Sequence, residues 1–120
     1  MKYTDLQRVK KMYENAKKLE RYISKMHIDK KMVIDDYTIQ WAVTTPLFQI
    51  GEHAYYLSNE FKEAHGELKW HAISGLRHRL VHDYDDTNWS LIADIIFQDI
   101  PILITQTQEI LEKEYRENDE

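Results

Sequence analysis

Apolar residues recur at every third or fourth position along most of the chain, which is the spacing of amphipathic helices. The first run predicts a long helix over residues 6–26, with an apolar stripe of Leu6, Val9, Met12, Tyr13, Ala16, Leu19, Ile23 and Met26. A second run, from Ile39 to Leu57, predicts a helix that begins after Asp35 or Asp36, because either carboxylate can cap the first turn. Pro46 is expected to kink or divide it, since proline removes a backbone donor.

The pattern breaks at Gly66, and a third helix is expected after it. Its apolar stripe contains Trp70, Ile73, Leu76 and Leu80. Residues 83–88, DYDDTN, are rich in side chains that cap helices and therefore predict a loop.

The last predicted helix begins at Trp89 and is bent where Pro101 removes a backbone donor. A frayed tail is expected over residues 115–120. The pattern as a whole predicts a single all-α domain over residues 1–120, a four- to five-helix up-and-down bundle.

Composition supports this class, because only three of the 120 residues are glycine and two are proline. The chain has no cysteine, which excludes a disulfide framework, a thiolate nucleophile and a cysteine-type zinc site. Charges occur throughout the first twenty residues, and no apolar run approaches the length that spans a bilayer. We therefore expect a cytoplasmic protein without membrane contact.

The net charge of −5 argues against a protein that binds nucleic acid through a broad basic surface. The charges are unevenly distributed, however, because residues 1–31 contain ten of the sixteen lysines and arginines but only four of the twenty-one acidic residues. The first helix could therefore face an anion or an acidic partner. The alternative is a solvated, lysine-rich surface helix.

The third helix leads into GLRHRLVHDY, residues 75–84, which contains two histidines, two arginines and a tyrosine. On a regular helix, three histidines fall within about 40° of each other on the face nearly opposite the apolar stripe: His71, His78 and His82. These histidines avoid the predicted core. They are either simply exposed to solvent or lie where a second copy of the chain packs.

Arg77 and His82 are five positions apart, so on a regular helix they point about 140° away from each other. They can share one substrate only if the helix ends before His82 or if the site is assembled from two subunits. A symmetric homodimer would place two copies of each side chain in one cleft.

Cationic side chains beside a histidine suit the cleavage of an RNA phosphodiester bond. RNA supplies its own nucleophile, the 2′-hydroxyl, so the protein needs only to remove that proton, protonate the leaving 5′-oxygen and stabilise the added charge on the phosphorane. His82 is a candidate base or acid, Arg77 can hold the phosphoryl oxygens, and Arg79 is a candidate for substrate binding. This chemistry requires no cofactor.

The alternative chemistry is a metal site. His78 and His82 have the i, i+4 spacing of two zinc ligands on a helix, and His71 lies on the same face. The glutamate of the metalloprotease pattern is missing, because the sequence reads His-Arg-Leu-Val-His. Arg77 and Arg79 would also repel a dication. We therefore expect no metal.

The same segment resembles the R-x4-6-H-x-Y signature of HepT-like toxins, a branch of the HEPN superfamily of helical RNA-cleaving domains. Arg77, His82 and Tyr84 match its three fixed positions. WHAISGLRHRLVHDY resembles the family's W-x-x-I-x-G-M-R-N-x-x-x-H-x-Y block, IGEHAYYL resembles the I-G-E-A segment of its central helix, and Ile100-Pro101 resembles the L-P of its last helix. The resemblance runs through nearly the whole chain.

This resemblance implies a HEPN-like homodimer with its cleft at the interface, in which Arg77 and His82 are the catalytic pair. His78, where the family commonly has asparagine, would assist or orient them. The resemblance also implies the toxin of a type II or type VII-like toxin–antitoxin system. Its antitoxin would be an MNT-type nucleotidyltransferase that transfers AMP to Tyr84.

Three functions remain open from the sequence. The chain is a metal-independent endoribonuclease toxin, a binding protein that cleaves RNA poorly and serves the nucleotidyltransferase as partner and AMP acceptor, or a purely structural helical dimer. A neighbouring reading frame with the nucleotidyltransferase pattern G-S-x10-D-x-D would favour the first two.

Overall fold

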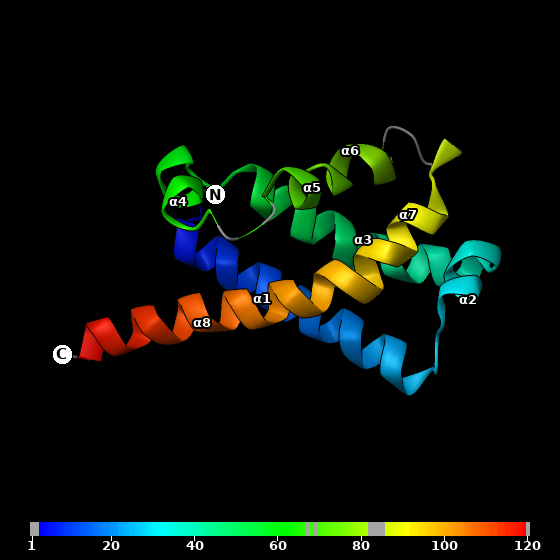
Figure 1. Ribbon diagram of the computed structural model, residues 1–120, viewed down its shortest axis with the longest axis horizontal. Helices are drawn as coiled ribbons and strands as arrows, with labels where there is room; N and C mark the ends of the chain where they lie inside the picture. The colour runs from blue at the N-terminus through cyan, green and yellow to red at the C-terminus, as the bar shows by residue number, and fades with distance from the viewer. Residues whose placement is uncertain (1–2, 67, 69, 82–85, 120) are drawn as a thin grey trace.

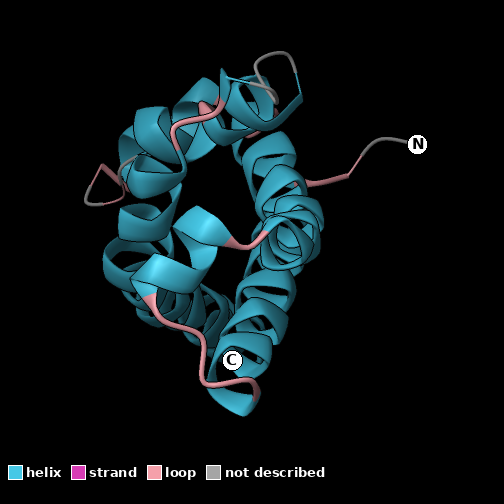
Figure 2. Cartoon of the chain, turned by 90° about the vertical axis from the view of Figure 1, so that its right-hand side faces the viewer, coloured by secondary structure: helices cyan, strands magenta, loops and turns pink. Residues whose placement is uncertain are grey.

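The computed structural model describes residues 3–66, 68, 70–81 and 86–119, and within these residues it contains helices and loops but no strand (Figure 2). Four helical legs form its main body and run alternately in opposite directions along the long axis (Figure 1). In chain order, the legs are α1 (Asp5–Lys25), α3 (Tyr37–Tyr55), α5 (Trp70–Ser74) with α6 (Leu76–Val81), and α7 (Trp89–Asp94) continuing into α8 (Ile100–Asp119). The predicted all-α up-and-down bundle is confirmed.

Local sequence sets both ends of α1. The Thr4 hydroxyl accepts the backbone N–H of Gln7 at 3.1 Å, and the Gln7 side chain accepts the backbone N–H of Thr4 at 2.9 Å. At the other end His27 has a φ of 51°, a left-handed conformation that stops the helix. The middle of the predicted stripe is buried, whereas Met26 is exposed because it is the C-cap.

The second predicted helix corresponds to α3. Asp36 is its N-cap, as one of the two predicted alternatives, and its carboxylate accepts the backbone N–H of Thr38 at 2.9 Å. Pro46 lies inside α3, which continues unbroken to Tyr55, so a division at Pro46 is wrong. Proline deletes one donor, and the buried neighbours Val43 and Leu47 hold the helix against the core on both sides of it.

Two short helices were not predicted, α2 (Lys30–Asp35) and α4 (Asn59–Ala64). Each has six residues, which is less than two turns and too short for a helical period to be visible. Side-chain caps start both of them: Asp29 accepts the backbone N–H of Met32 at 2.9 Å, and Ser58 accepts that of Phe61 at 3.1 Å.

The third predicted helix is interrupted at Gly75, which separates α5 from α6. Glycine favours such a break because it costs conformational entropy in a helix and has no side chain to pack. The predicted apolar stripe is nevertheless buried on both pieces, at Trp70, Ile73, Leu76 and Leu80. The indole N–H of Trp70 donates to the carbonyl of His65 at 2.9 Å, which ties the start of α5 to the end of α4.

The bend predicted near Pro101 takes the form of a π-helical turn, η2 (Ile95–Asp99), between α7 and α8. In this turn the backbone N–H of Ile100 donates to the carbonyl of Ile95, five residues back. A proline ring clashes with the carbonyl four residues before it in a regular helix, and the wider turn relieves that clash. From there α8 continues to Asp119, through most of the segment predicted to fray.

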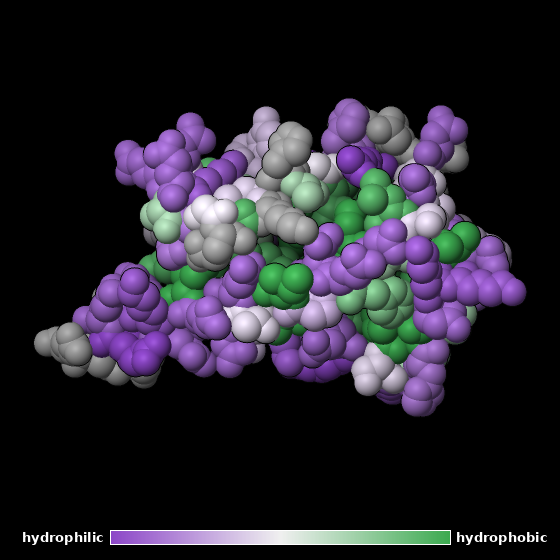
Figure 3. Space-filling view, in the orientation of Figure 1, coloured by the Kyte–Doolittle hydropathy of each residue, from purple (hydrophilic) through white to green (hydrophobic). Residues whose placement is uncertain are grey.

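A continuous hydrophobic core joins all four legs. The buried hydroxyl of Thr107 is satisfied within it, because it donates to the carbonyl of Leu103 at 2.7 Å. The face seen in Figure 3 is largely hydrophilic and is interrupted by apolar patches. In the part of the chain described here, no helix is both long and apolar enough to cross a membrane.

Candidate functional site

Gly51 allows α3 to approach the start of α6 closely. A Cβ atom on Gly51 would lie 2.9 Å from the backbone nitrogen of Arg77 and 3.1 Å from the carbonyl oxygen of Ile73. Because Gly51 does not have a positive φ, the position requires glycine for space rather than for its conformational freedom. The close approach places the backbone of Arg77 against the last turns of α3.

Glu52, the next residue on α3, holds the side chain of Arg77. Arg77 Nε donates to Glu52 Oε2 at 2.8 Å, and the two side chains are 32% and 28% exposed. This hydrogen bond, reinforced by the carboxylate charge, raises the pKa of Arg77 above its already high ordinary value. Among the described residues, the hydrogen bond of Arg77 is made through Nε, and a guanidinium group has two further nitrogens that can bind an anion.

Two tyrosines at the end of α3 lie beside the same guanidinium group. The guanidinium carbon of Arg77 is 4.4 Å from the ring centroid of Tyr55 and 5.6 Å from that of Tyr56. These are cation–π distances, and the rings restrict where the guanidinium can move. Glu52, Tyr55 and Tyr56 therefore preorganise Arg77 from one face of α3.

Arg8 on α1 reaches the same end of α3. Its Nη1 donates to Nδ1 of His53 at 3.2 Å, and its guanidinium carbon lies 5.2 Å from the centroid of Tyr56. Because arginine can only donate, Nδ1 accepts and the His53 ring is neutral. Burial, and then the charges of Arg8 and Lys11, lower the pKa of His53. His53 therefore positions Arg8 through a mainly uncharged ring at neutral pH.

The structure describes some of the predicted site residues and leaves others outside its description. Arg77 is half-buried against α3, while His78 and Arg79 are exposed on α6. His71 belongs to α5, but its side chain lies outside the description, and His82 and Tyr84 lie outside the described residues. The histidine face and the relation of Arg77 to His82 therefore stay predictions.

Arg79 borders a pocket of about 290 Å³ between α6 and the start of α7. The Thr87 hydroxyl donates to the Arg79 carbonyl there at 3.0 Å. This pocket gives the predicted substrate-binding role of Arg79 a concave setting. Among the described residues, no three His, Asp or Glu side chains converge on a possible metal position.

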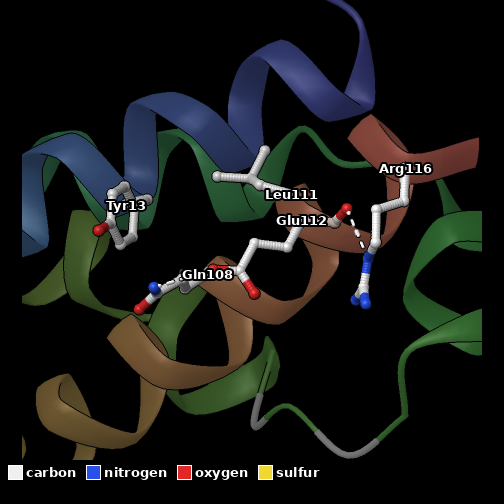
Figure 4. Close-up of a pocket in the computed structure, with 5 residues that line it drawn as sticks. All are labelled: Tyr13, Gln108, Leu111, Glu112 and Arg116. Carbon is white, nitrogen blue, oxygen red and sulfur yellow. Dashed lines mark hydrogen bonds between the residues drawn. The ribbon is translucent and has the colours of Figure 1, made fainter. Parts of the chain in front are cut away.

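A second pocket, of about 550 Å³, lies between α1 and α8 (Figure 4). It is lined by Tyr13, Gln108, Leu111, Glu112 and Arg116. Its polar side chains bond within α8, since the Gln108 amide donates to Glu112 Oε1 at 3.1 Å and Arg116 Nε donates to the Glu112 carbonyl at 3.4 Å. It contains none of the predicted site residues and is not the candidate site.

Sequence reasoning missed the residues that surround Arg77. Glu52, Tyr55 and Tyr56 lie within the IGEHAYYL block, and their spacing of three and four positions places them on one side of a helix. That spacing was a usable signal for a shared face. Arg8 offered none, because it is 45 positions from His53 and meets it only through the packing of α1 on α3.

The chain is similar to a family of ribonucleases and to several proteins provisionally named as such. The model of a family described as Ribonuclease HepT-like matches residues 12–110. A protein of Caldanaerobacter subterraneus subsp. tengcongensis, provisionally named an RNase, is 37% identical over 81 residues, which are 68% of this chain and 72% of that protein. A Methanocaldococcus jannaschii protein, also provisionally named an RNase, is 30% identical over 98 residues, 82% of this chain and 79% of that protein.

A third relative, from Thermococcus cleftensis, is provisionally named ribonuclease HepT. It is 32% identical over 68 residues, which are 57% of this chain and 62% of that protein. No solved structure matches the chain at a significant level.

Proposed function

The chain belongs to the HepT-like ribonuclease family, and we propose that it is a metal-independent endoribonuclease that acts as the toxin of a toxin–antitoxin system. Arg77 and His82 are its catalytic residues in this proposal. His78 assists them, Arg79 contacts the RNA, and the site forms between the two subunits of a homodimer.

The setting of Arg77 is the observation that supports this proposal most directly. Its Nε is bound to Glu52 and its guanidinium lies beside two tyrosine rings, and a guanidinium held through Nε can still bind a phosphate through its terminal nitrogens. A cation fixed in this way stabilises charge that develops on a phosphate without first having to reorganise.

The reaction follows from the chemistry of RNA. His82 removes the proton of the 2′-hydroxyl, the 2′-oxygen attacks phosphorus, and the bond to the 5′-oxygen breaks as that oxygen takes up a proton. The products are a 2′,3′-cyclic phosphate and a free 5′-hydroxyl. Arg77 stabilises the additional negative charge on the phosphorane.

We expect the purified protein to cleave single-stranded RNA in the presence of EDTA. His82→Ala should lower the cleavage rate by about 10²–10⁴-fold, because a positioned acid or base contributes that much. His27→Asn is a matched control, since His27 lies outside the site and asparagine tolerates its left-handed backbone. Gel analysis of a labelled RNA measures the cleavage rates of the wild type and of both variants. Loss of cleavage in EDTA and its recovery with zinc would show that the histidines form a metal site.

Whether the site is assembled from two subunits can be tested with the same cleavage assay. Arg77→Ala and His82→Ala subunits, co-expressed with different tags and purified as a mixed dimer, retain one Arg77 and one His82 on opposite subunits. If the pair acts across the interface, the mixed dimer regains part of the activity that both parent variants lack. An inactive mixed dimer would place the pair within one subunit and leave the ribonuclease assignment standing.

The partner in this proposal is an MNT-type nucleotidyltransferase antitoxin. With ATP and magnesium, the Tyr84 oxygen attacks the α-phosphorus, AMP is transferred and pyrophosphate leaves. The added phosphate opposes RNA entry through its negative charge beside Arg77. Intact-mass spectrometry should show an adenylyl adduct on the wild type and none on Tyr84→Phe, which should also escape neutralisation. An adduct retained by Tyr84→Phe would move the modification to another residue.

A further inference from the structure

The start of α1, the end of α3 and α4 lie together at one end of the molecule (Figure 1). Exposed tyrosines and basic side chains meet there. Tyr55 and Tyr56 are 51% and 52% exposed, so about half of each large ring is accessible to a ligand. Arg8 and Arg77 flank them, and Lys62 donates to the carbonyl of Tyr55 at 3.3 Å. We call Tyr55, Tyr56, Arg8 and Arg77 the tyrosine platform.

The geometry of the tyrosine platform links the candidate site to α1. The rings of Tyr55 and Tyr56 are 5.0 Å apart and nearly perpendicular, at 86°. The two guanidinium carbons lie within 5.6 Å of one ring centroid, that of Tyr56, so they are no more than about 11 Å apart. The platform thus extends from Arg77 toward the start of α1 by a distance that fits adjoining phosphates of one strand.

The two arginines give the tyrosine platform positive charge, whereas the net charge of the whole chain is negative. Acids also lie at this end of the molecule: Glu52 binds Arg77, Asp5 accepts the backbone N–H and the hydroxyl of Ser58 at 2.9 and 2.7 Å, and α4 carries the exposed Glu60 and Glu63. Lys11 follows Arg8 on α1 by three positions and pairs with Glu14 at 4.0 Å. What suits a polyanion here is the closeness of two guanidinium groups, Arg8 and Arg77, on a protein whose net charge is −5.

We propose that the tyrosine platform is a subsite for unpaired RNA nucleotides next to the scissile phosphate. One base stacks on an exposed tyrosine ring, and Arg8 binds the adjoining phosphate while Arg77 holds the phosphate that reacts. Exposed rings between cations favour single strands, because bases in a duplex are already stacked on one another. This subsite rests on the proposed ribonuclease function for the identity of its ligand.

Binding can be measured apart from cleavage in a His82→Ala background, using fluorescence anisotropy of a short, labelled single-stranded oligoribonucleotide of mixed sequence. Tyr56→Ala should weaken binding by roughly tenfold, the effect of losing one base stack, while Tyr56→Phe should bind normally. Tyr37→Ala is the matched control, because Tyr37 is 62% exposed and makes an edge-to-face contact with Trp41 at the opposite end of α3.

Arg8 is tested by Arg8→Gln, which keeps an amide donor for His53 and removes the charge. Binding should weaken, and the dependence of affinity on salt concentration should become shallower by about one ion, because one phosphate contact is lost. Thermal unfolding of each variant separates loss of binding from loss of fold.

Three results would overturn the subsite. Tyr56→Ala and Tyr37→Ala could bind RNA equally well. Duplex RNA could bind as tightly as the single strand, which excludes stacking. Tyr56→Ala could convert a dimer into a monomer in light scattering, which would make the tyrosines a contact between copies. A protein that binds RNA through Tyr56 and Arg8 but never cleaves it would instead refute the ribonuclease proposal and keep the subsite.

Discussion

Arg77→Ala is expected to lower kcat for RNA cleavage by about 10²–10³-fold, the cost of removing one preorganised donor from a developing oxyanion. The loss should appear mainly in kcat, because Arg77 stabilises charge that is greatest in the transition state. Arg116→Ala is the matched control, since Arg116 is an exposed arginine whose Nε bonds the backbone of its own helix. Single-turnover kinetics on a labelled RNA measures both variants.

Two more substitutions show whether the partners of Arg77 matter. Arg77→Lys keeps the charge but loses both the Nε hydrogen bond to Glu52 and the planar group that lies beside Tyr55, so it should recover little activity. Glu52→Gln keeps an oxygen acceptor for Arg77 Nε and should therefore lose less cleavage activity than Glu52→Ala. If Arg77→Lys cleaves RNA like the wild type, only a positive charge is needed and the preorganisation argument is wrong.

The helices were predictable where a local signal was long enough. The stripe from Val9 to Leu19 and the cap at Asp36 depend on neighbours a few positions away, and both were confirmed. The two prolines did not predict the local helix geometry. Pro46 leaves α3 undivided, whereas Pro101 follows a π-helical turn, so the presence of a proline does not by itself predict which of the two forms.

The candidate site was predictable only along a single element. The segment around Arg77 could be recognised as a candidate site because its charged residues lie close together in sequence. Glu52 was not assigned a role, since it meets Arg77 from 25 positions away and only because two helices touch. Contacts of this kind depend on the distance between helices, which is decided by the volume of a residue such as Gly51 and not by the period of the sequence.

Gly51→Ala is expected to destabilise the protein by about 1–3 kcal/mol, because the new methyl group would overpack the contact between α3 and α6. The nearest atoms are the backbone nitrogen of Arg77 at 2.9 Å and the backbone oxygen of Ile73 at 3.1 Å. Backbone atoms cannot rotate away as the end of a side chain can, so the helices must move apart. Urea unfolding measures the loss of stability.

The same substitution should reduce cleavage, since any movement of α6 away from α3 lengthens the 2.8 Å bond between Arg77 and Glu52. Gly66→Ala is the control: its φ is not positive, and the nearest atom to a new Cβ there, the Glu63 carbonyl oxygen, is 3.8 Å away. That variant should be as stable as the wild type or slightly more stable, because alanine has less freedom to lose on folding. Equal stability of Gly51→Ala and Gly66→Ala would mean that α3 and α6 are not held at this distance. The arrangement of Arg77 against Glu52 would then need another cause.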